Sequence, residues 1–148
     1  MIIKRWDEIS TRLYTPHLRL KEFFCQCGMC IDQIIDPELV QKLEQLRTII
    51  DSPLSIVSGF RCYRHNATLK DASPHSMHLY GQAADVLSMG FSTVEIAKIG
   101  YKLGFNGIGV SDHFTHLDIR KGKFAFWVYN NLDLDIIKRD VTGGTSGL

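Results

Sequence analysis

The chain has 148 residues, of which 45% are hydrophobic and 22% are charged, and its formal net charge is +1. This length and composition suit one globular domain with one hydrophobic core and exclude a disordered chain. The near-neutral charge does not favour nucleic-acid binding by bulk electrostatics, and no apolar run approaches the ~20 residues that a membrane helix needs. We therefore expect neither a nucleic-acid partner nor a membrane partner.

The two ends of the chain carry their own signals. The N-terminal segment MIIKRWDEIS lacks the long apolar core and the small-residue cleavage site of a signal peptide, so we expect synthesis in the cytoplasm without one. The small and polar C-terminal segment TGGTSGL predicts a flexible tail, which we place at residues 141–148, after a domain of residues 1–140.

The first regular element is a helix. Residues 1–35 look irregular, although LRLKEFFC (18–25) suits a short strand or turn that packs two phenylalanines inward. DPELVQKLEQLRTIID (36–51) predicts a helix with Asp36 as N-cap and Pro37 in the first turn. One apolar stripe recurs along it at spacings of three or four residues, formed by Leu39, Leu43, Leu46 and Ile50.

Strands and a second helix follow. PLSIVSGF (53–60) and GQAADVLS (81–88) predict strands, the second of them small and buried. STVEIAKIGYKLG (92–104) predicts a helix, because Ser92 and Glu95 form a capping-box pattern and a glycine ends the segment.

The C-terminal third predicts three further strands, GIGV (107–110), FTHLDIR (114–120) and FAFWVYN (124–130). Two main helices and four or five strands in uneven order favour an α+β fold, with a small antiparallel sheet and flanking helices in a single domain. Nothing in the pattern demands more than a monomer.

Three side chains are candidate metal ligands. A catalytic zinc site takes three protein ligands and leaves a fourth position to water. His78 lies in a polar loop, Asp85 lies in a small-residue strand, and His116 lies on the polar face of another strand. Neighbouring antiparallel strands would bring Asp85 and His116 together. Spacing alone also allows the plain alternative that each histidine is a hydrogen-bonded surface or core residue.

A longer motif surrounds these residues. SMHLYGQAAD (76–85) matches S-x-H-x-x-G-x-A-x-D at every fixed position. It resembles the motif of the zinc D-Ala-D-Ala carboxypeptidase and L-alanoyl-D-glutamate peptidase family, peptidase family M15, which has the Hedgehog/DD-peptidase fold. SGFRCYRHNA (58–67) and GIGVSDHFTHLDIR (107–120) resemble two further family segments. The resemblance runs from about Leu20 to Trp127 and implies a zinc peptidase domain with its core at about residues 20–130.

Carried over position by position, the resemblance implies that the zinc ligands are His78, Asp85 and His116. It implies that Arg61 clamps a substrate carboxylate or carbonyl, a task that suits a bidentate guanidinium. Ser76 is expected beside a ligand or the substrate. Asp118 is expected to orient His116 rather than to bind the ion.

The general base is where the sequence departs from the family. Many members carry Glu or Asp three residues before the last ligand histidine, and others carry His two residues before it. Those positions here hold His113 and Phe114. The candidates that remain are His113 and its neighbour Asp112, and we favour His113, since histidine performs base chemistry near neutral pH. Both also suit an exposed turn.

The chain has four cysteines: Cys25, Cys27, Cys30 and Cys62. They would supply four thiolates to a second, structural zinc ion, although C-x-C-x-x-C is not the usual paired C-x-x-C spacing. A disulfide to Cys62 would suit an exported protein, and reduced thiols would suit a cytosolic one. The sequence leaves all three interpretations open.

The resemblance as a whole implies a zinc-dependent metallopeptidase whose partners are peptidoglycan stem peptides. We expect zinc to activate water, His113 or Asp112 to take the proton, and Arg61 to help polarise the carbonyl. The expected bond involves a D-amino acid, with D-Ala-D-Ala carboxypeptidase or L-alanoyl-D-glutamate endopeptidase specificity. A phage endolysin that reaches the cell wall after lysis is the expected setting. The altered base position keeps open a zinc-containing binding module without catalysis, or a phage structural protein of the same fold.

Overall fold

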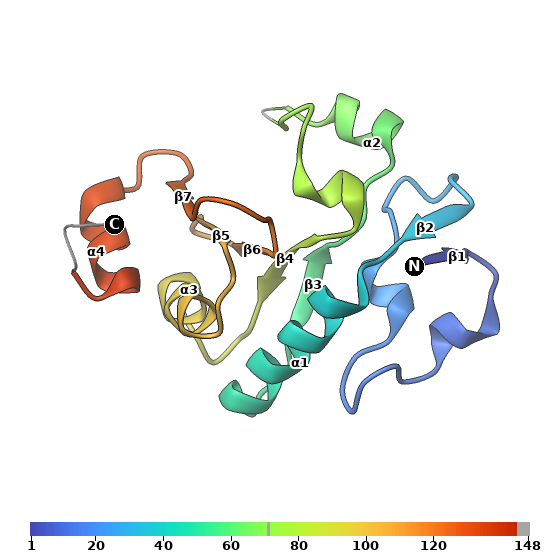
Figure 1. Ribbon diagram of the computed structural model, residues 1–148, viewed down its shortest axis with the longest axis horizontal. Coiled ribbons are helices and arrows are strands. Elements are labelled where there is room, and N and C mark those ends of the chain that lie inside the picture. Colours follow the sequence, from blue (N-terminus) through green and yellow to red (C-terminus); the bar gives the residue numbers. More distant parts are fainter. Residues whose placement is uncertain (71, 145–148) are drawn as a thin grey trace.

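A computed structural model describes residues 1–70 and 72–144 of the chain (Figure 1). No helix within these ranges is long and apolar enough to cross a membrane. The strands are β1 (Ile2–Lys4), β2 (Asp32–Ile34), β3 (Ser55–Ser58), β4 (Ala83–Leu87), β5 (Gly107–Val110), β6 (Thr115–Asp118) and β7 (Ala125–Val128). The α-helices are α1 (Pro37–Ile50), α2 (Tyr63–Thr68), α3 (Thr93–Lys102) and α4 (Leu134–Thr142), and the 3₁₀ helices are η1 (Glu8–Thr11), η2 (Leu20–Phe23) and η3 (Met77–Tyr80).

The main sheet has five strands in the order β3-β4-β6-β5-β7. Its neighbouring strands are antiparallel except β5 and β7, which run parallel. The predicted α+β class and the predicted positions of all five strands are confirmed, but the sheet is not purely antiparallel. The chain leaves β6 and passes β5 before it forms β7. Both strands therefore run opposite to β6 and parallel to each other.

The two predicted helices form as their caps dictate. The Asp36 side chain accepts the backbone N–H of Glu38 at 2.9 Å, and Pro37 opens α1. In α3, the Ser92 and Glu95 side chains each accept the other's backbone N–H at 3.0 Å, which is the predicted capping box.

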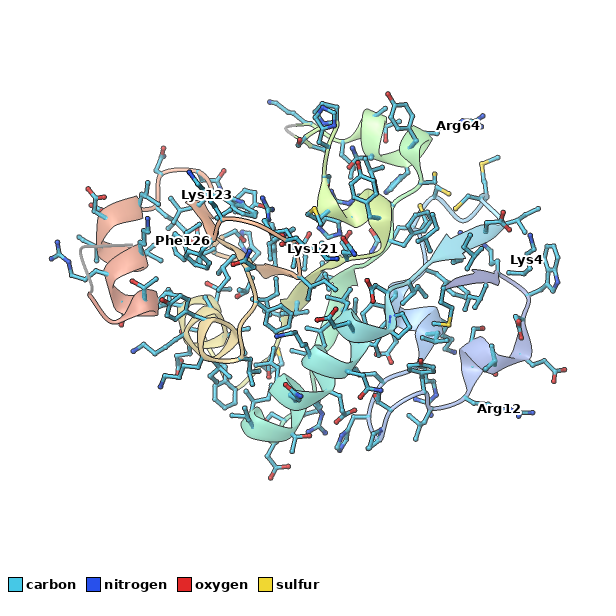
Figure 2. The ribbon with its side chains drawn as sticks, in the orientation of Figure 1. Lys4, Arg12, Arg64, Lys121, Lys123 and Phe126 are labelled. Atoms are coloured by element: carbon cyan, nitrogen blue, oxygen red, sulfur yellow. The ribbon has the colours of Figure 1, made fainter. Side chains whose placement is uncertain are left out.

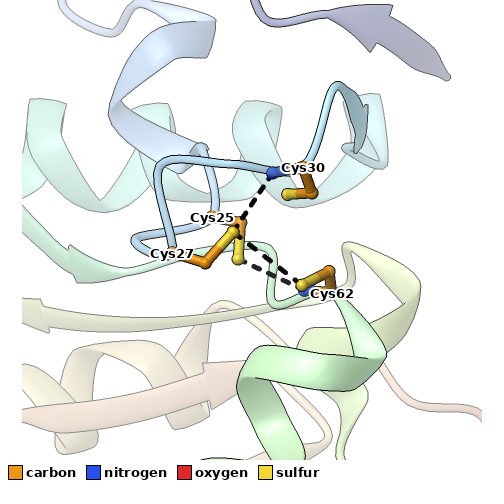
Figure 3. A group of neighbouring side chains, drawn as sticks. All are labelled: Cys25, Cys27, Cys30 and Cys62. Carbon is orange, nitrogen blue, oxygen red and sulfur yellow. Dashed lines mark hydrogen bonds between the residues drawn. The ribbon is translucent and has the colours of Figure 1, made fainter.

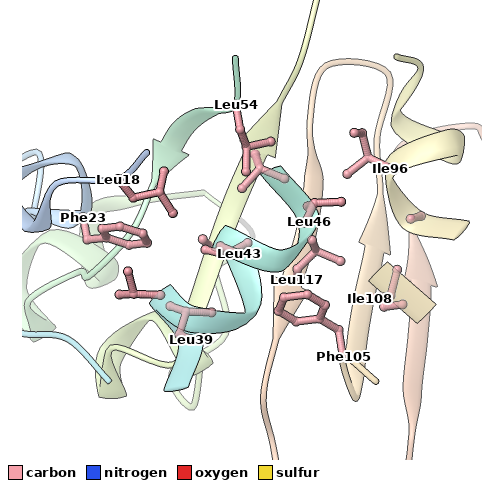
Figure 4. Close-up of a cluster of buried hydrophobic side chains, with 14 of the residues drawn as sticks. Leu18, Phe23, Leu39, Leu43, Leu46, Leu54, Ile96, Phe105, Ile108 and Leu117 are labelled. Atoms are coloured by element: carbon pink, nitrogen blue, oxygen red, sulfur yellow. The ribbon is translucent and has the colours of Figure 1, made fainter. Parts of the chain in front are cut away.

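The hydrophobic core lies on one face of the sheet (Figure 4). Side chains alternate between the faces of a strand, so Ala84 and Val86 of β4 share a face with Leu117 of β6. The predicted α1 stripe, Leu39, Leu43, Leu46 and Ile50, is buried in this core. Asp85 lies between Ala84 and Val86 in β4, and His116 precedes Leu117 in β6. Asp85 and His116 therefore face the opposite side of the sheet.

Several short elements were missed by the sequence patterns. Residues 20–23 form the 3₁₀ helix η2 rather than a strand or simple turn, and Phe23 is buried as predicted. Helix α4 begins at Leu134, with the Asp133 side chain accepting the N–H of Ile136 at 3.0 Å. It continues to Thr142, so the predicted tail starts inside a helix. The last part of that tail, 145–148, lies outside the described residues.

The N-terminal region contacts the segment that follows β3. Strands β1 and β2 form a separate antiparallel pair, seen next to α1 in Figure 1. The backbone N–H of Phe60 donates to the carbonyl oxygen of Phe23 at 2.8 Å. Gly59 permits this approach, since a Cβ there would lie 2.6 Å from the Phe23 Cα. Figure 2 shows the basic side chains of Lys4, Arg12 and Arg64 at the edge of the molecule.

Candidate active site

Three predicted ligands converge on the sheet face opposite the core. Asp85 and His116 are direct partners across β4 and β6, which confirms that neighbouring antiparallel strands bring them together. His78 reaches them from η3, and the ligand atoms of the three residues lie within 4.8 Å of one another. The Asp85 Oδ1 atom lies 3.3 Å from His78 Nε2 and 3.1 Å from His116 Nδ1. Tetrahedral zinc with nitrogen and oxygen ligands spaces its donors by roughly 3.4 Å, so the set fits one ion. We call these residues the His-Asp-His site.

The orientation of His78 leaves one ring nitrogen for an ion. Its Nδ1–H donates to the carbonyl oxygen of Gly59 at 2.7 Å. Its Nε2 is buried and has no hydrogen-bond partner among residues 1–70 and 72–144. Burial lowers the pKa of His78, which favours the neutral ring. A buried, unpaired lone pair is costly unless something binds it, and a metal ion fits that need.

The backbone around His78 is set by its neighbours. Ser76 is the N-cap of η3, and its hydroxyl oxygen accepts the His78 N–H at 3.2 Å. The motif serine therefore holds the helix that carries a predicted ligand, and it also lines the cavity beside the site. Gly81 ends η3 at a φ of 68°, a left-handed conformation that glycine adopts readily.

Asp118 is placed to orient His116. Its Oδ2 atom lies 2.7 Å from His116 Nε2, and Arg120 donates to both of its carboxylate oxygens, at 2.9 and 2.7 Å. Burial opposes ionisation of Asp118, yet these hydrogen bonds hold its pKa well below the ordinary value. Gly107, the cross-strand partner of Asp118, leaves the space, since a Cβ there would lie 2.2 Å from both carboxylate oxygens.

The remaining pKa shifts follow from charges packed together. Burial acts to raise the pKa of Asp85, but its hydrogen bond with His116 and the nearby imidazole of His78 hold it well below its ordinary value. For His116, burial acts to lower the pKa, whereas the carboxylates of Asp118 and Asp85 raise it. The His-Asp-His site therefore carries an ionised carboxylate and strongly polarised imidazoles.

Asp118→Asn is expected to weaken metal binding at the His-Asp-His site by about 10- to 100-fold, because the carboxylate that fixes a ligand histidine is lost. Competition titration with a zinc chelator measures this. Asp140→Asn is the matched control, since Asp140 is an exposed carboxylate whose partner is Lys98. Equal zinc affinity of Asp118→Asn and the control would contradict the orienting role.

Arg61 contacts the site from the start of the segment after β3. Its Nη2 donates to Asp85 Oδ2 at 3.2 Å, and its Nε donates to Ser58 Oγ at 3.2 Å. A weaker contact of 3.4 Å joins Nη1 to the Asn66 side-chain oxygen. The guanidinium is thus fixed beside a predicted ligand and lines the cavity. Its substrate contact stays a prediction.

The two candidate bases differ in their placement. Both are exposed residues of the turn between β5 and β6, in which Ser111 Oγ accepts the backbone N–H groups of His113 and Phe114, each at 3.0 Å. His113 lines the cavity beside the His-Asp-His site, whereas Asp112 is not among the described residues that do so. The geometry favours His113, although its role as base stays a prediction.

A cavity of about 720 Å³ lies over the site. Its wall includes three residues that the sequence analysis did not assign to the site: Arg120, Trp127 and Tyr129. The Trp127 ring lies 4.9 Å from that of His116. Gly109 makes room for it, since a Cβ there would lie 2.5 Å from the indole nitrogen. A signal for this is present in the sequence GIGV, where Gly107 and Gly109 alternate with large core residues. The two glycines leave space on the site face of β5 for the side chains of Asp118 and Trp127.

The fold and the site together have the features of a metal-dependent hydrolase. Three buried donors stand at a cavity, and the described residues place no fourth ligand beside them, as in catalytic rather than structural zinc sites. The family model described as Peptidase M15 matches residues 16–118, so the chain belongs to this family of zinc-dependent metallopeptidases. This confirms the family and the fold that the motifs imply. A search of curated proteins finds no match to the chain.

Proposed function

We propose that the chain is a zinc-dependent peptidoglycan peptidase that hydrolyses a stem-peptide or cross-link bond involving a D-amino acid. The observation that carries the proposal is the His-Asp-His site itself, with its unpaired His78 Nε2 beside an open cavity. His78 Nε2, His116 Nδ1 and an oxygen of Asp85 would hold the ion. A zinc ion bound there supplies a Lewis acid that activates water and polarises a carbonyl.

The chain's own residues would supply the rest of the chemistry. His113 is the only cavity-lining histidine in the turn before β6, and it would take a proton from water and deliver it to the leaving amine. Arg61 would stabilise negative charge that develops on the carbonyl oxygen. Burial raises the pKa of Tyr129, so its hydroxyl stays protonated and is available as a hydrogen-bond donor in the cavity.

The charge of the cavity supports an anionic peptide as substrate. Its described lining includes Arg61, Lys70 and Arg120 but a single acid, Asp85, which pairs with Arg61, while Arg120 pairs with Asp118 outside the lining. Stem peptides carry free carboxylates on D-residues, and a basic wall would hold them. D-Ala-D-Ala carboxypeptidase and L-alanoyl-D-glutamate endopeptidase activity are the two specificities we propose to distinguish.

The test is incubation of the zinc-loaded protein with purified peptidoglycan. We expect release of new amino groups, loss of this activity with a zinc chelator and its return when zinc is added. His113→Ala is expected to lower the rate by about 10²- to 10⁴-fold, the usual contribution of a general base. Lys123→Ala, an exposed residue outside the cavity lining, is the control. Masses of the released fragments name the bond.

A binding module without catalysis is the second candidate, and one observation favours it. No Glu or second Asp stands among the described lining residues to serve as a conventional carboxylate base. Full zinc content with no cleavage of any wall type would support this candidate over the peptidase. An endolysin-like setting is also proposed, and loss of turbidity when the protein is added to permeabilised bacteria would test it.

A further inference from the structure

We propose that Cys25, Cys27, Cys30 and Cys62 bind a second, structural zinc ion that joins the N-terminal region to the segment carrying Arg61. The four sulfur atoms lie within 4.8 Å of one another (Figure 3). Cys62 Sγ lies 3.9 Å from Cys27 Sγ. Tetrahedral zinc with sulfur ligands at ~2.3 Å spaces them by roughly 3.8 Å, which matches this contact. We call these residues the cysteine cluster.

Each sulfur of the cysteine cluster faces N–H donors. Cys27 Sγ accepts the backbone N–H groups of Met29 and Cys30, both at 3.3 Å. Cys25 Sγ accepts the N–H of Cys62 at 3.3 Å, and Cys62 Sγ accepts the N–H of His65 at 3.4 Å. Donors directed at sulfur stabilise thiolates, which are the form that binds zinc.

Two polar side chains complete the surroundings of Cys30. Gln33 is fully buried. Its amide donates to Cys30 Sγ at 3.3 Å, and its oxygen accepts the N–H of Cys25 at 2.8 Å. Arg5 donates to the Cys30 carbonyl oxygen at 2.8 Å and reaches Cys30 Sγ at 3.5 Å. Four thiolates and one Zn²⁺ carry a net negative charge, which the Arg5 cation partly offsets.

The location of the cysteine cluster explains what the ion would do. Cys25, Cys27 and Cys30 belong to the loop between η2 and β2, and Cys62 is the N-cap of α2. Cys62 directly follows Arg61, which contacts Asp85. The ion would therefore fix a surface loop to the segment that positions Arg61, without contacting the His-Asp-His site. A structural site of this kind is closed by four protein ligands.

The disulfide alternative fits the arrangement less well. A disulfide draws two sulfurs to ~2.05 Å and removes them from a four-fold cluster. In this structure all four cysteines are free, and donors surround all of their sulfur atoms. A disulfide between one pair would leave the other two thiols unpaired.

The experiment counts zinc in variants that empty each site separately. The His78→Ala/His116→Ala protein is expected to retain one zinc ion per chain, because the cysteine cluster is intact. Cys30→Ser is expected to lose that ion and to unfold at a lower temperature. Met29→Ala is the matched control, since the Met29 side chain is exposed and the substitution keeps the backbone N–H that donates to Cys27 Sγ.

A second measurement keeps the proposal testable if Cys30→Ser fails to fold. Cobalt substitution of the His78→Ala/His116→Ala protein is expected to give the strong sulfur-to-metal charge-transfer absorption of tetrathiolate coordination. Four thiols should become reactive only after a chelator is added. A double-histidine variant without metal, or with thiols already paired as disulfides, would overturn the proposal. Absent peptidase activity would not, because zinc counting does not depend on catalysis.

Discussion

Asp85→Ala is expected to abolish zinc binding at the His-Asp-His site and to reduce peptidase activity to background. Asp85 Oδ1 lies within 3.3 Å of both ligand histidines, and the described residues that line the cavity include no other carboxylate. The metal-free protein should also be less stable. The side chains of Asp85 and Arg61 are 7% and 14% exposed, and removal of one partner from a buried ion pair costs about 3–5 kcal/mol.

Two measurements separate the effects of Asp85→Ala. Zinc content per chain, compared with that of the unsubstituted protein, reports the ligand role. Thermal unfolding in the presence of a chelator reports the contacts of Asp85 with Arg61 and the two histidines, without the contribution of the ion. Asp85→Asn keeps the volume and one acceptor oxygen but removes the charge, so it should lose zinc as well. Unchanged zinc content in both variants would show that Asp85 is not a ligand.

The sequence predicts the core elements well because local and global signals agree there. In α1, the cap at Asp36 specifies where the helix begins, and the stripe from Leu39 to Ile50 specifies the face that packs against the sheet. Both signals agree with the fold. In β4 and β6, alternation predicts that Asp85 and His116 share the face opposite Leu117. The central pairing of the site follows from that alternation.

What the sequence missed depends on tertiary contacts. Helix α4 is short, and its contacts with α3 and β7 supply stability that no local pattern records. The parallel placement of β7 beside β5 depends on the path of the loop after β6. That placement brings Trp127 and Tyr129 to the cavity, so the position of neither residue in the sequence assigns it to the site.

The choice between the two candidate bases also depends on tertiary structure that the sequence does not record. Sequence spacing leaves both His113 and Asp112 as candidate bases, because adjacent turn residues carry no period, and His113 is favoured only for the base chemistry of histidine. The turn is fixed by the backbone N–H groups of His113 and Phe114, which donate to Ser111 Oγ, and in this turn His113 lines the cavity. Spacing predicts which residues share a strand face, but not which residue of a turn points into a cleft.

Gly81→Ala is expected to destabilise the protein by about 2–5 kcal/mol and to weaken zinc binding at the His-Asp-His site. An L-residue in the left-handed conformation costs about 1–2 kcal/mol, and forced overpacking adds about 1–3 kcal/mol. The overpacking arises because the new Cβ would lie 2.2 Å from the Ile34 carbonyl oxygen. The Gly81 carbonyl oxygen also accepts the N–H of Asp36 at 3.0 Å, so the turn cannot shift without disturbing the start of α1.

Gly122→Ala is the matched control for this substitution. Gly122 also has a positive φ, of 89°, but a Cβ there would meet nothing within 4 Å. It should therefore show the conformational cost alone, about 1–2 kcal/mol, with zinc affinity unchanged. Denaturant unfolding of the two variants isolates the contact with Ile34 as the difference between them. Equal destabilisation would mean that the turn relaxes freely. His78, three residues before Gly81, would then owe its position to Ser76 and Gly59 rather than to this close contact.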